Sequence, residues 1–390
     1  MPDARSLSGS PPLKAPPAGR LSDSIAVARV LCILGIVYVH AWTGRPDWWL
    51  VQTIESGQGV FRWILMEAFG RSAVPLLGMV SGWLVAGSSR LSPYGPFLAS
   101  KAKTILLPMI LWNALSMVLV SGAASLGLLQ APVPHDLWWL VDELFCLVTM
   151  NDINVQTAFL RDLFVCMALA PLLLRLPRLW FLGVLGAVTA WAVSGWEFAL
   201  ILRPQIPLFF LLGIVVRRAG LAERLGTLSF ALALGPALLL VSLKIWLSVW
   251  EHGLVSVLSP TFIALDIATR LAVSLAMWRV AWALAASPAP FRRIEPYAFL
   301  MFCTHLILIW LATPLLEVFP GPLGSPGYPV LFVLQPALAM GLTILIGRGL
   351  LRLSPPMATL LSGGRLKANG GHRPRPPSSA TPSVNAAGAG

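Results

Sequence analysis

The sequence predicts an all-α integral membrane protein of about ten transmembrane helices, with both termini in the cytoplasm. Of its 390 residues, 57% are hydrophobic and only 11% are charged, whereas charged residues make up about a quarter of a soluble domain. The mean hydropathy is +0.78. Apolar runs of about twenty residues, which are long enough to cross the hydrocarbon core as helices, recur along the chain. The alternating pattern of an outer-membrane barrel is missing.

The predicted helices follow one another with short connections, apart from a longer acidic connection after the third. In the second helix, Pro75 predicts a kink, and Gly78 and Gly82 form a stripe of small residues for close helix packing. The ten predicted spans cover residues 23–42, 60–86, 105–124, 157–174, 179–196, 204–217, 228–250, 260–285, 297–318 and 327–350.

The polar ends of the chain and the charges of the loops predict its organisation. We expect a disordered basic N-terminal tail (1–21), one transmembrane domain (22–352) and a disordered basic C-terminal tail (353–390). Basic residues gather in both tails and in alternate loops, and acidic residues in the other loops, which predicts cytoplasmic termini. Because the net charge of +12 is distributed in this way, we expect no nucleic-acid partner. The four cysteines form no CxxC pair, so no metal site is expected.

The first span carries two residues that a lipid-buried helix should avoid, Arg29 and His40. At about 100° per residue, the eleven steps between them make about three turns plus 20°, so both lie on one helix face, about 16 Å apart along the axis. A guanidinium and an imidazole on one stripe of a membrane span form a functional-site hypothesis. For His40, the alternative is an interfacial residue with its tip in water.

Other ionisable residues inside spans can pair along their own helices. Glu67 and Arg71 are four positions apart, as are Asp266 and Arg270, and each pair could be structural or bind substrate. Lys244 lies near the outer end of its span and is expected to reach the headgroups.

Arg161 and Asp162 are adjacent, so they are expected to point in different directions and to need partners on other helices. Arg29 has no carboxylate three or four positions away within its span. The predicted spans contain five cations and three carboxylates, which leaves two positive charges in excess; these residues are Arg29, Arg71, Arg161, Lys244 and Arg270, and Glu67, Asp162 and Asp266. Because a guanidinium does not deprotonate, we expect an anionic ligand or water access. His305, in the middle of its span, is either hydrogen-bonded to a neighbouring helix or part of a site.

Several segments resemble the membrane acyltransferase 3 family over residues 22–352. Arg29 and His40 match the family's R-x10-H first-helix signature, and four further segments are similar in order and place. The sequence departs from the family pattern at two places. Lys101 and Lys103 replace an arginine pair, and Phe302 stands where a tyrosine is expected. The four segments are RSAVPLLGMVSGWLV (71–85), KAKTILLPMILW (101–112), TAFLRDLFVCMALAPLLL (157–174) and YAFLMFCTHLILIW (297–310).

The resemblance implies a multi-pass enzyme of the bacterial inner membrane. It would move an acyl group from cytoplasmic acyl-CoA, with acetyl-CoA or succinyl-CoA as co-substrate and no metal, to a hydroxyl group of an exopolysaccharide, O-antigen or other periplasmic or lipid-linked glycan. The implied partners are membrane lipids, the glycan or lipid-linked sugar acceptor and proteins of polysaccharide synthesis.

This resemblance and the charge pattern together assign roles to individual residues, as a hypothesis. Arg29 would anchor an anionic part of acyl-CoA, with Lys101 and Lys103 near its phosphates. His40 would act as general base or carry the acyl group, and Arg161 would assist at the acceptor or the thioester oxygen. Arg71 and His305 are the remaining candidates for substrate binding.

Two other classes of protein fit the same pattern. The kinked second helix and the buried charges would equally suit an exporter or flippase of an anionic or acylated glycan. A scaffold within a polysaccharide-synthesis complex is the third alternative.

Overall fold

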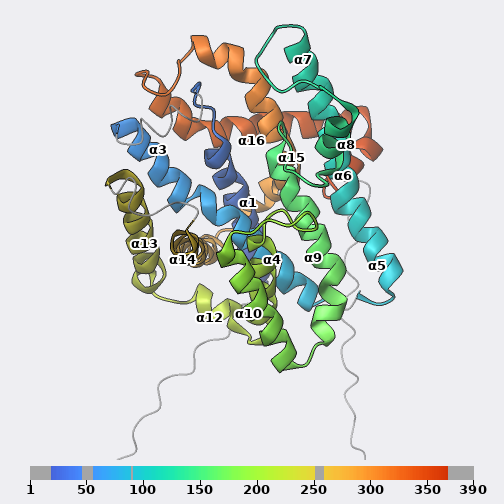
Figure 1. Cartoon of the computed structure of the whole chain (residues 1–390), viewed down its shortest axis with the longest axis vertical. Helices are drawn as coiled ribbons and strands as arrows, with labels where there is room; N and C mark the ends of the chain where they lie inside the picture. Colours follow the sequence, from blue (N-terminus) through green and yellow to red (C-terminus); the bar gives the residue numbers. More distant parts are fainter. Residues whose placement is uncertain (1–18, 46–55, 89–90, 251–258, 368–390) are drawn as a thin grey trace, which may run out of the picture.

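The computed structural model describes residues 19–45, 56–88, 91–250 and 259–367, which form a bundle of helices (Figure 1). No β-strand occurs in these residues, apart from one isolated bridge between Phe198 and Ile201. Eight helical segments of the described chain are long and apolar enough to cross a membrane, which confirms the all-α membrane protein. These segments are Arg20–His40, Gly57–Ala86, Tyr94–Ser125, Val155–Arg175, Phe230–Ser248, Pro260–Leu284, Ala289–Val318 and Tyr328–Leu353.

Two of the ten predicted spans correspond to shorter helices. These are α10 (Arg178–Ser194), with 17 residues, and α11 (Gln205–Arg218), with 14 residues. At 1.5 Å per residue, their lengths of about 26 and about 21 Å fall short of the roughly 30 Å hydrocarbon core. The number of ten spans and the sidedness of the termini therefore stay predictions.

The first helix, α1 (Arg20–His40), lies near the middle of the bundle, with α3 and α13 on its left and α6 on its right in Figure 1. It packs against α4, α14, α15 and α16. Its side chains at Val27, Ala28, Val30 and Cys32 are fully buried. The other helices of this part of the bundle are α13 (Phe230–Trp250), α14 (Pro260–Leu284), α15 (Ala289–Val318) and α16 (Tyr328–Leu353), with the short α12 (Leu221–Gly226) before α13.

The second span is broken, as Pro75 predicts. It consists of α3 (Gly57–Ala68), a 3₁₀ turn (Gly70–Ser72) and α4 (Ala73–Ala86). Because proline lacks an N–H and its ring crowds the preceding turn, the regular helix resumes only just before Pro75. At the break, Gly70 packs so closely on α1 that a Cβ there would lie 2.8 Å from the Val39 side chain.

The next span begins earlier than predicted, so its two lysines lie in a helix and not in a loop. It runs through α5 (Tyr94–Lys101), α6 (Leu107–Ser116) and α7 (Gly122–Ser125), which are joined by π-helical turns at Ala102–Leu106 and Met117–Ser121. Lys101 ends α5 and Lys103 lies in the first π turn. Arg90, which precedes this span in the sequence, lies outside the described residues.

The long acidic connection is folded and covers one end of α6 and α9 (Ala158–Arg175). It contains α8 (Leu137–Phe145), whose Glu143 carboxylate accepts backbone N–H groups of Asp152 and Ile153. Trp310 of α15 donates to the carbonyl of Ile153 at 3.2 Å. Burial raises the pKa of the Cys146 thiol in this connection to about 11, which favours the protonated thiol at neutral pH.

The chain after α16 also differs from the prediction, because part of the predicted C-terminal tail is ordered. It forms α17 (Pro355–Leu361), and the described chain continues to Lys367. Trp112 of α6 donates its indole N–H to the carbonyl of Leu361 at 2.9 Å, and Leu366 is buried. Residues 354–367 therefore pack back on the transmembrane helices, through contacts that the composition of the segment does not reveal.

The predicted stripe of small residues is the place where α4 and α11 touch. A Cβ on Gly82 would overlap the backbone carbonyl of Phe210, and a Cβ on Gly213 would overlap that of Met79. Because these neighbours are backbone atoms, they cannot move aside without separating the helices.

Replacing Gly82 with alanine should therefore lower the stability of the protein by about 1–3 kcal/mol, the usual cost of overpacking. Thermal unfolding in detergent measures this loss. Gly235→Ala in α13 is the matched control, because no atom lies within 4 Å of its ideal Cβ, and its melting temperature should stay the same or rise slightly. Equal melting temperatures for the two variants would contradict the close helix contact.

Candidate active site

A cavity of about 360 Å³ adjoins Arg29 of α1, and we term it the Arg29 pocket. Its polar lining includes Arg29, Lys101, Glu295 and Arg365, and the rest is mainly apolar, with Ile33, Phe159, Phe299 and Phe302 among the lining residues. The pocket therefore combines a charged region with an apolar region, which suits a ligand with an anionic part and an uncharged part.

Arg29 forms an ion pair with a residue of another helix, whereas the sequence showed no carboxylate partner for it within its own span. Its Nη1 lies 2.8 Å from Glu295 Oε1 of α15, and the two side chains are 38% and 28% exposed. The charge count missed Glu295 because this residue precedes the predicted start of its span at residue 297. The Glu295 carboxylate therefore balances the positive charge of Arg29, which the sequence left without a partner. Both side chains still line the pocket and remain accessible to a ligand.

The two lysines of the third span differ in their placement. Lys101 lines the Arg29 pocket, with its Nζ 5.6 Å from the centroid of the Phe97 ring. Lys103 is exposed and does not belong to the pocket lining. The structure thus brings only Lys101 together with Arg29.

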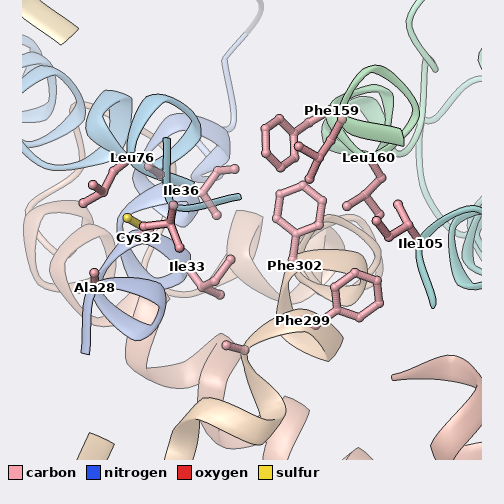
Figure 2. Close-up of a cluster of buried hydrophobic side chains, with 14 of the residues drawn as sticks. Ala28, Cys32, Ile33, Ile36, Leu76, Ile105, Phe159, Leu160, Phe299 and Phe302 are labelled. Carbon is pink, nitrogen blue, oxygen red and sulfur yellow. The ribbon is translucent and has the colours of Figure 1, made fainter. Parts of the chain in front are cut away.

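Phe302 lies between the Arg29 pocket and a pair of histidines. It lines the pocket, its ring centroid is 5.7 Å from that of Phe159, and it is 6.4 Å from that of His305. Figure 2 shows Phe302 and Phe159 facing each other, with Ile33 and Ile36 of α1 beside them. Phe302 therefore connects the lining of the pocket with the imidazole of His305.

His40 and His305 come together although they are far apart in the sequence. Their ring centroids are 5.6 Å apart, with the ring planes inclined by 45°. His40 is half-buried, and His305 is fully buried on α15. The sequence pattern alone did not predict that these two rings would meet.

The contacts of His305 define its tautomer. Nδ1 lies 3.0 Å from the carbonyl oxygen of Met301, one turn earlier on the same helix, so we assign the proton to Nδ1. Nε2 is then a lone-pair acceptor, and it is buried with no hydrogen-bond partner among the described residues. Among the residues that the structure describes, His305 forms no hydrogen bond to a neighbouring helix, which was the structural alternative for this residue.

Lys244 is buried in a cluster of charges and does not reach the headgroups, which corrects the prediction. Its Nζ lies 2.7 Å from Glu67 Oε2 and 2.6 Å from Asp266 Oδ1, and the residue is 2% exposed. The reason is helix packing: α13 lies against α3 and α14, which carry the two carboxylates.

The two predicted i,i+4 pairs are confirmed, and Lys244 joins them into one cluster. Arg71 Nε lies 2.9 Å from Glu67 Oε1, and Arg270 Nε lies 2.6 Å from Asp266 Oδ2. Three cations and two carboxylates leave this cluster with one positive charge in excess. Arg71 belongs to the cluster and does not line the Arg29 pocket.

Arg161 and Asp162 contact each other, although the prediction assigned each a partner on another helix. Arg161 Nη1 lies 2.8 Å from Asp162 Oδ1, and Arg161 also donates to the carbonyls of Leu147 and Ala199. Asp162 accepts the backbone N–H of Arg203 at 2.9 Å. These bonds fasten the chain before α11 to α9, so Arg161 has a structural function, and its role at the acceptor stays a prediction.

Two residues that line the Arg29 pocket, Glu295 and Arg365, were not predicted from the sequence. Glu295 could have been found as a carboxylate nearly two turns inside the N-terminal end of a longer helix, whereas Arg365 lies in a stretch whose composition predicts a tail. In the described part of the chain, no group of three His, Cys, Asp or Glu side chains could hold a metal ion.

Substituting Lys244 with methionine should destabilise the protein by about 3–5 kcal/mol, because two buried carboxylates lose their shared cation. Thermal unfolding in detergent measures the change. The double variant Lys244→Met/Glu67→Gln should recover part of the loss, and Arg352→Met, at an exposed position of α16, should leave stability within about 0.5 kcal/mol. A Lys244→Met protein as stable as the Arg352→Met control would contradict the buried cluster.

Comparisons with known proteins identify the family of the chain. A family model described as an acyltransferase domain, Acyl_transf_3, matches residues 22–348. The succinoglycan biosynthesis protein ExoH of Rhizobium meliloti (strain 1021) is 27% identical over 371 residues, which cover 89% of this chain and 94% of the relative. No solved structure matches the chain significantly. The chain belongs to the membrane acyltransferase 3 family and is therefore an enzyme that transfers acyl groups.

Proposed function

We propose that this enzyme moves an acyl group from acyl-CoA to a hydroxyl group of a cell-surface or lipid-linked glycan, in the bacterial inner membrane. One observation carries the proposal: α1 presents Arg29 to a cation-lined pocket and His40 to a second, buried imidazole. An anion-binding region at the middle of α1 and a basic group at its C-terminal end are the parts that such a transfer needs. The relative's name, which refers to succinoglycan biosynthesis, supports a glycan as the acceptor.

The donor would bind in the Arg29 pocket. Arg29, Lys101 and Arg365 supply positive charge for its phosphates, and the apolar region beside Phe302 suits its uncharged pantetheine arm. The acyl group at the end of this arm would be acetyl or succinyl. The arm has to extend toward His40, which is about 16 Å from Arg29 along the helix axis. Glu295 would release Arg29, at least in part, when the donor's anionic group enters.

His40 would act as the general base. It takes the proton of the acceptor hydroxyl while that oxygen attacks the thioester carbon, the C–S bond breaks, and the proton passes on to the leaving thiolate. His305 would position His40, because its unpartnered Nε2 can accept an N–H of His40 directly or through water and so leave the other His40 nitrogen basic. In the alternative route, His40 carries the acyl group itself.

The buried cluster around Lys244 supports a second candidate function. Five charged side chains within helices of the bundle are also typical of a transporter, so the rival proposal is an exporter or flippase of an anionic or acylated glycan. The transporter would move glycan across the membrane without forming an ester.

Replacing His40 with alanine should lower acyl transfer by about 10²–10⁴-fold, the usual contribution of a general base. Membranes that contain the variant are incubated with radiolabelled acetyl- or succinyl-CoA, and label in the glycan is counted. Arg29→Gln should mainly raise the KM for acyl-CoA, and His305→Gln should lower kcat and shift its pH profile.

The matched control is His135→Ala, because the His135 side chain is exposed on the acidic connection, 66% accessible to solvent, and the variant should keep full activity. Near-normal transfer by His40→Ala, at an equal amount of protein in the membrane, would rule out this mechanism. Glycan export without any labelled ester in the wild type would favour the transporter.

A further inference from the structure

We propose that Arg365, from the segment after the last long helix, binds a phosphate group of the acyl donor. This inference rests on the proposed function, because it assigns a further binding residue to the Arg29 pocket. The segment that carries Arg365 reads as a tail in the sequence, yet in the structure it forms part of the pocket wall.

The segment is fixed firmly enough to position a side chain. Besides the bond from Trp112 to Leu361, the Leu366 backbone N–H donates to Ser362 Oγ at 2.9 Å, and Thr359 Oγ1 donates to the carbonyl of Leu366 at 3.0 Å. Ser362 and Leu366 are buried. These bonds close a compact turn around Arg365.

Two glycines direct this turn toward the pocket. Gly363 and Gly364 have φ values of 60° and 84°, which only glycine adopts without strain. A Cβ on Gly363 would overlap the carbonyl oxygen of Thr104, which belongs to the pocket lining. The close approach to Thr104 brings Arg365, two residues further along the chain, to the same wall of the pocket.

The guanidinium of Arg365 is held on one side and open on the other. Its Cζ lies 3.9 Å from the centroid of the Phe299 ring. Nη1 lies 3.2–3.5 Å from the carbonyls of Ser362, Gly363 and Thr104, whereas no hydrogen bond from Nε or Nη2 to the described residues is formed. Within the described chain no carboxylate pairs with it, and an open guanidinium edge matches the geometry of a phosphate.

The net positive charge of the Arg29 pocket favours a ligand with several negative charges. Arg29, Lys101 and Arg365 face a single carboxylate, that of Glu295, so two positive charges are left without a partner in the lining. Acyl-CoA carries a diphosphate and a 3′-phosphate. Lys101 offers a point charge only, whereas Arg365 can bind two phosphate oxygens at once.

The test is binding of acetyl-CoA and of acetyl-dephospho-CoA, which lacks the 3′-phosphate, to the purified full-length protein in nanodiscs. For Arg365→Gln we expect a Kd for acetyl-CoA that is about 10- to 100-fold higher, as for loss of charge-assisted hydrogen bonds. Arg365→Lys, which keeps the charge and is less disruptive, should show a smaller increase. Arg352→Gln, an exposed arginine in the last turn of α16, is the matched control and should bind like the wild type.

The outcomes separate the proposals. If Arg365→Gln weakens the binding of acetyl-CoA only, the residue binds the 3′-phosphate. If the affinities for acetyl-CoA and acetyl-dephospho-CoA fall by the same factor, it binds the diphosphate. Unchanged binding in Arg365→Gln and Arg365→Lys, or equal losses in Arg352→Gln, would overturn the role of Arg365. A wild-type protein that binds neither ligand would instead overturn the donor named under the proposed function, and with it this inference.

Discussion

The parallel packing of α1 against α15 is the constraint on which the candidate site depends. The two helices contact each other at three levels: Asp23 with Arg292 near their N-terminal ends, then Arg29 with Glu295, and then His40 with His305. Because the partners follow in the same order on both helices, a register shift of one helix would disrupt all three contacts. The register therefore fixes the anion-binding region and the imidazoles at the same time.

Close helix contacts hold this register from the outside. Gly70 lets the broken second span press on α1, and the same span carries Glu67 and Arg71 of the buried cluster. Since a buried ion pair costs desolvation of both groups, the cluster need not add net stability, but its ion pairs connect separate helices. It requires α3, α13 and α14 to meet at one place.

Features that lie within a single helix could be predicted from the sequence, whereas contacts between side chains of different helices could not. The face shared by Arg29 and His40, the two i,i+4 pairs and the close-packing glycines follow from helical periodicity, which is local. The partners Glu295 for Arg29 and the carboxylates for Lys244 lie on other helices, so only the packing reveals them. Arg365 was missed because a glycine-rich, basic stretch is typical of a disordered tail, whereas its order comes from contacts with α6 and α15.

The central claim is that the acyl group travels along α1, from a donor on the Arg29 side of the membrane to an acceptor on the His40 side. The most direct measurement uses proteoliposomes of defined orientation, with membrane-impermeant radiolabelled acyl-CoA on one side and oligosaccharides from the cell-surface glycan on the other. We predict labelled oligosaccharide only when acyl-CoA is supplied on the Arg29 side and the acceptor on the opposite side. Product that forms only when donor and acceptor share one side would contradict the account.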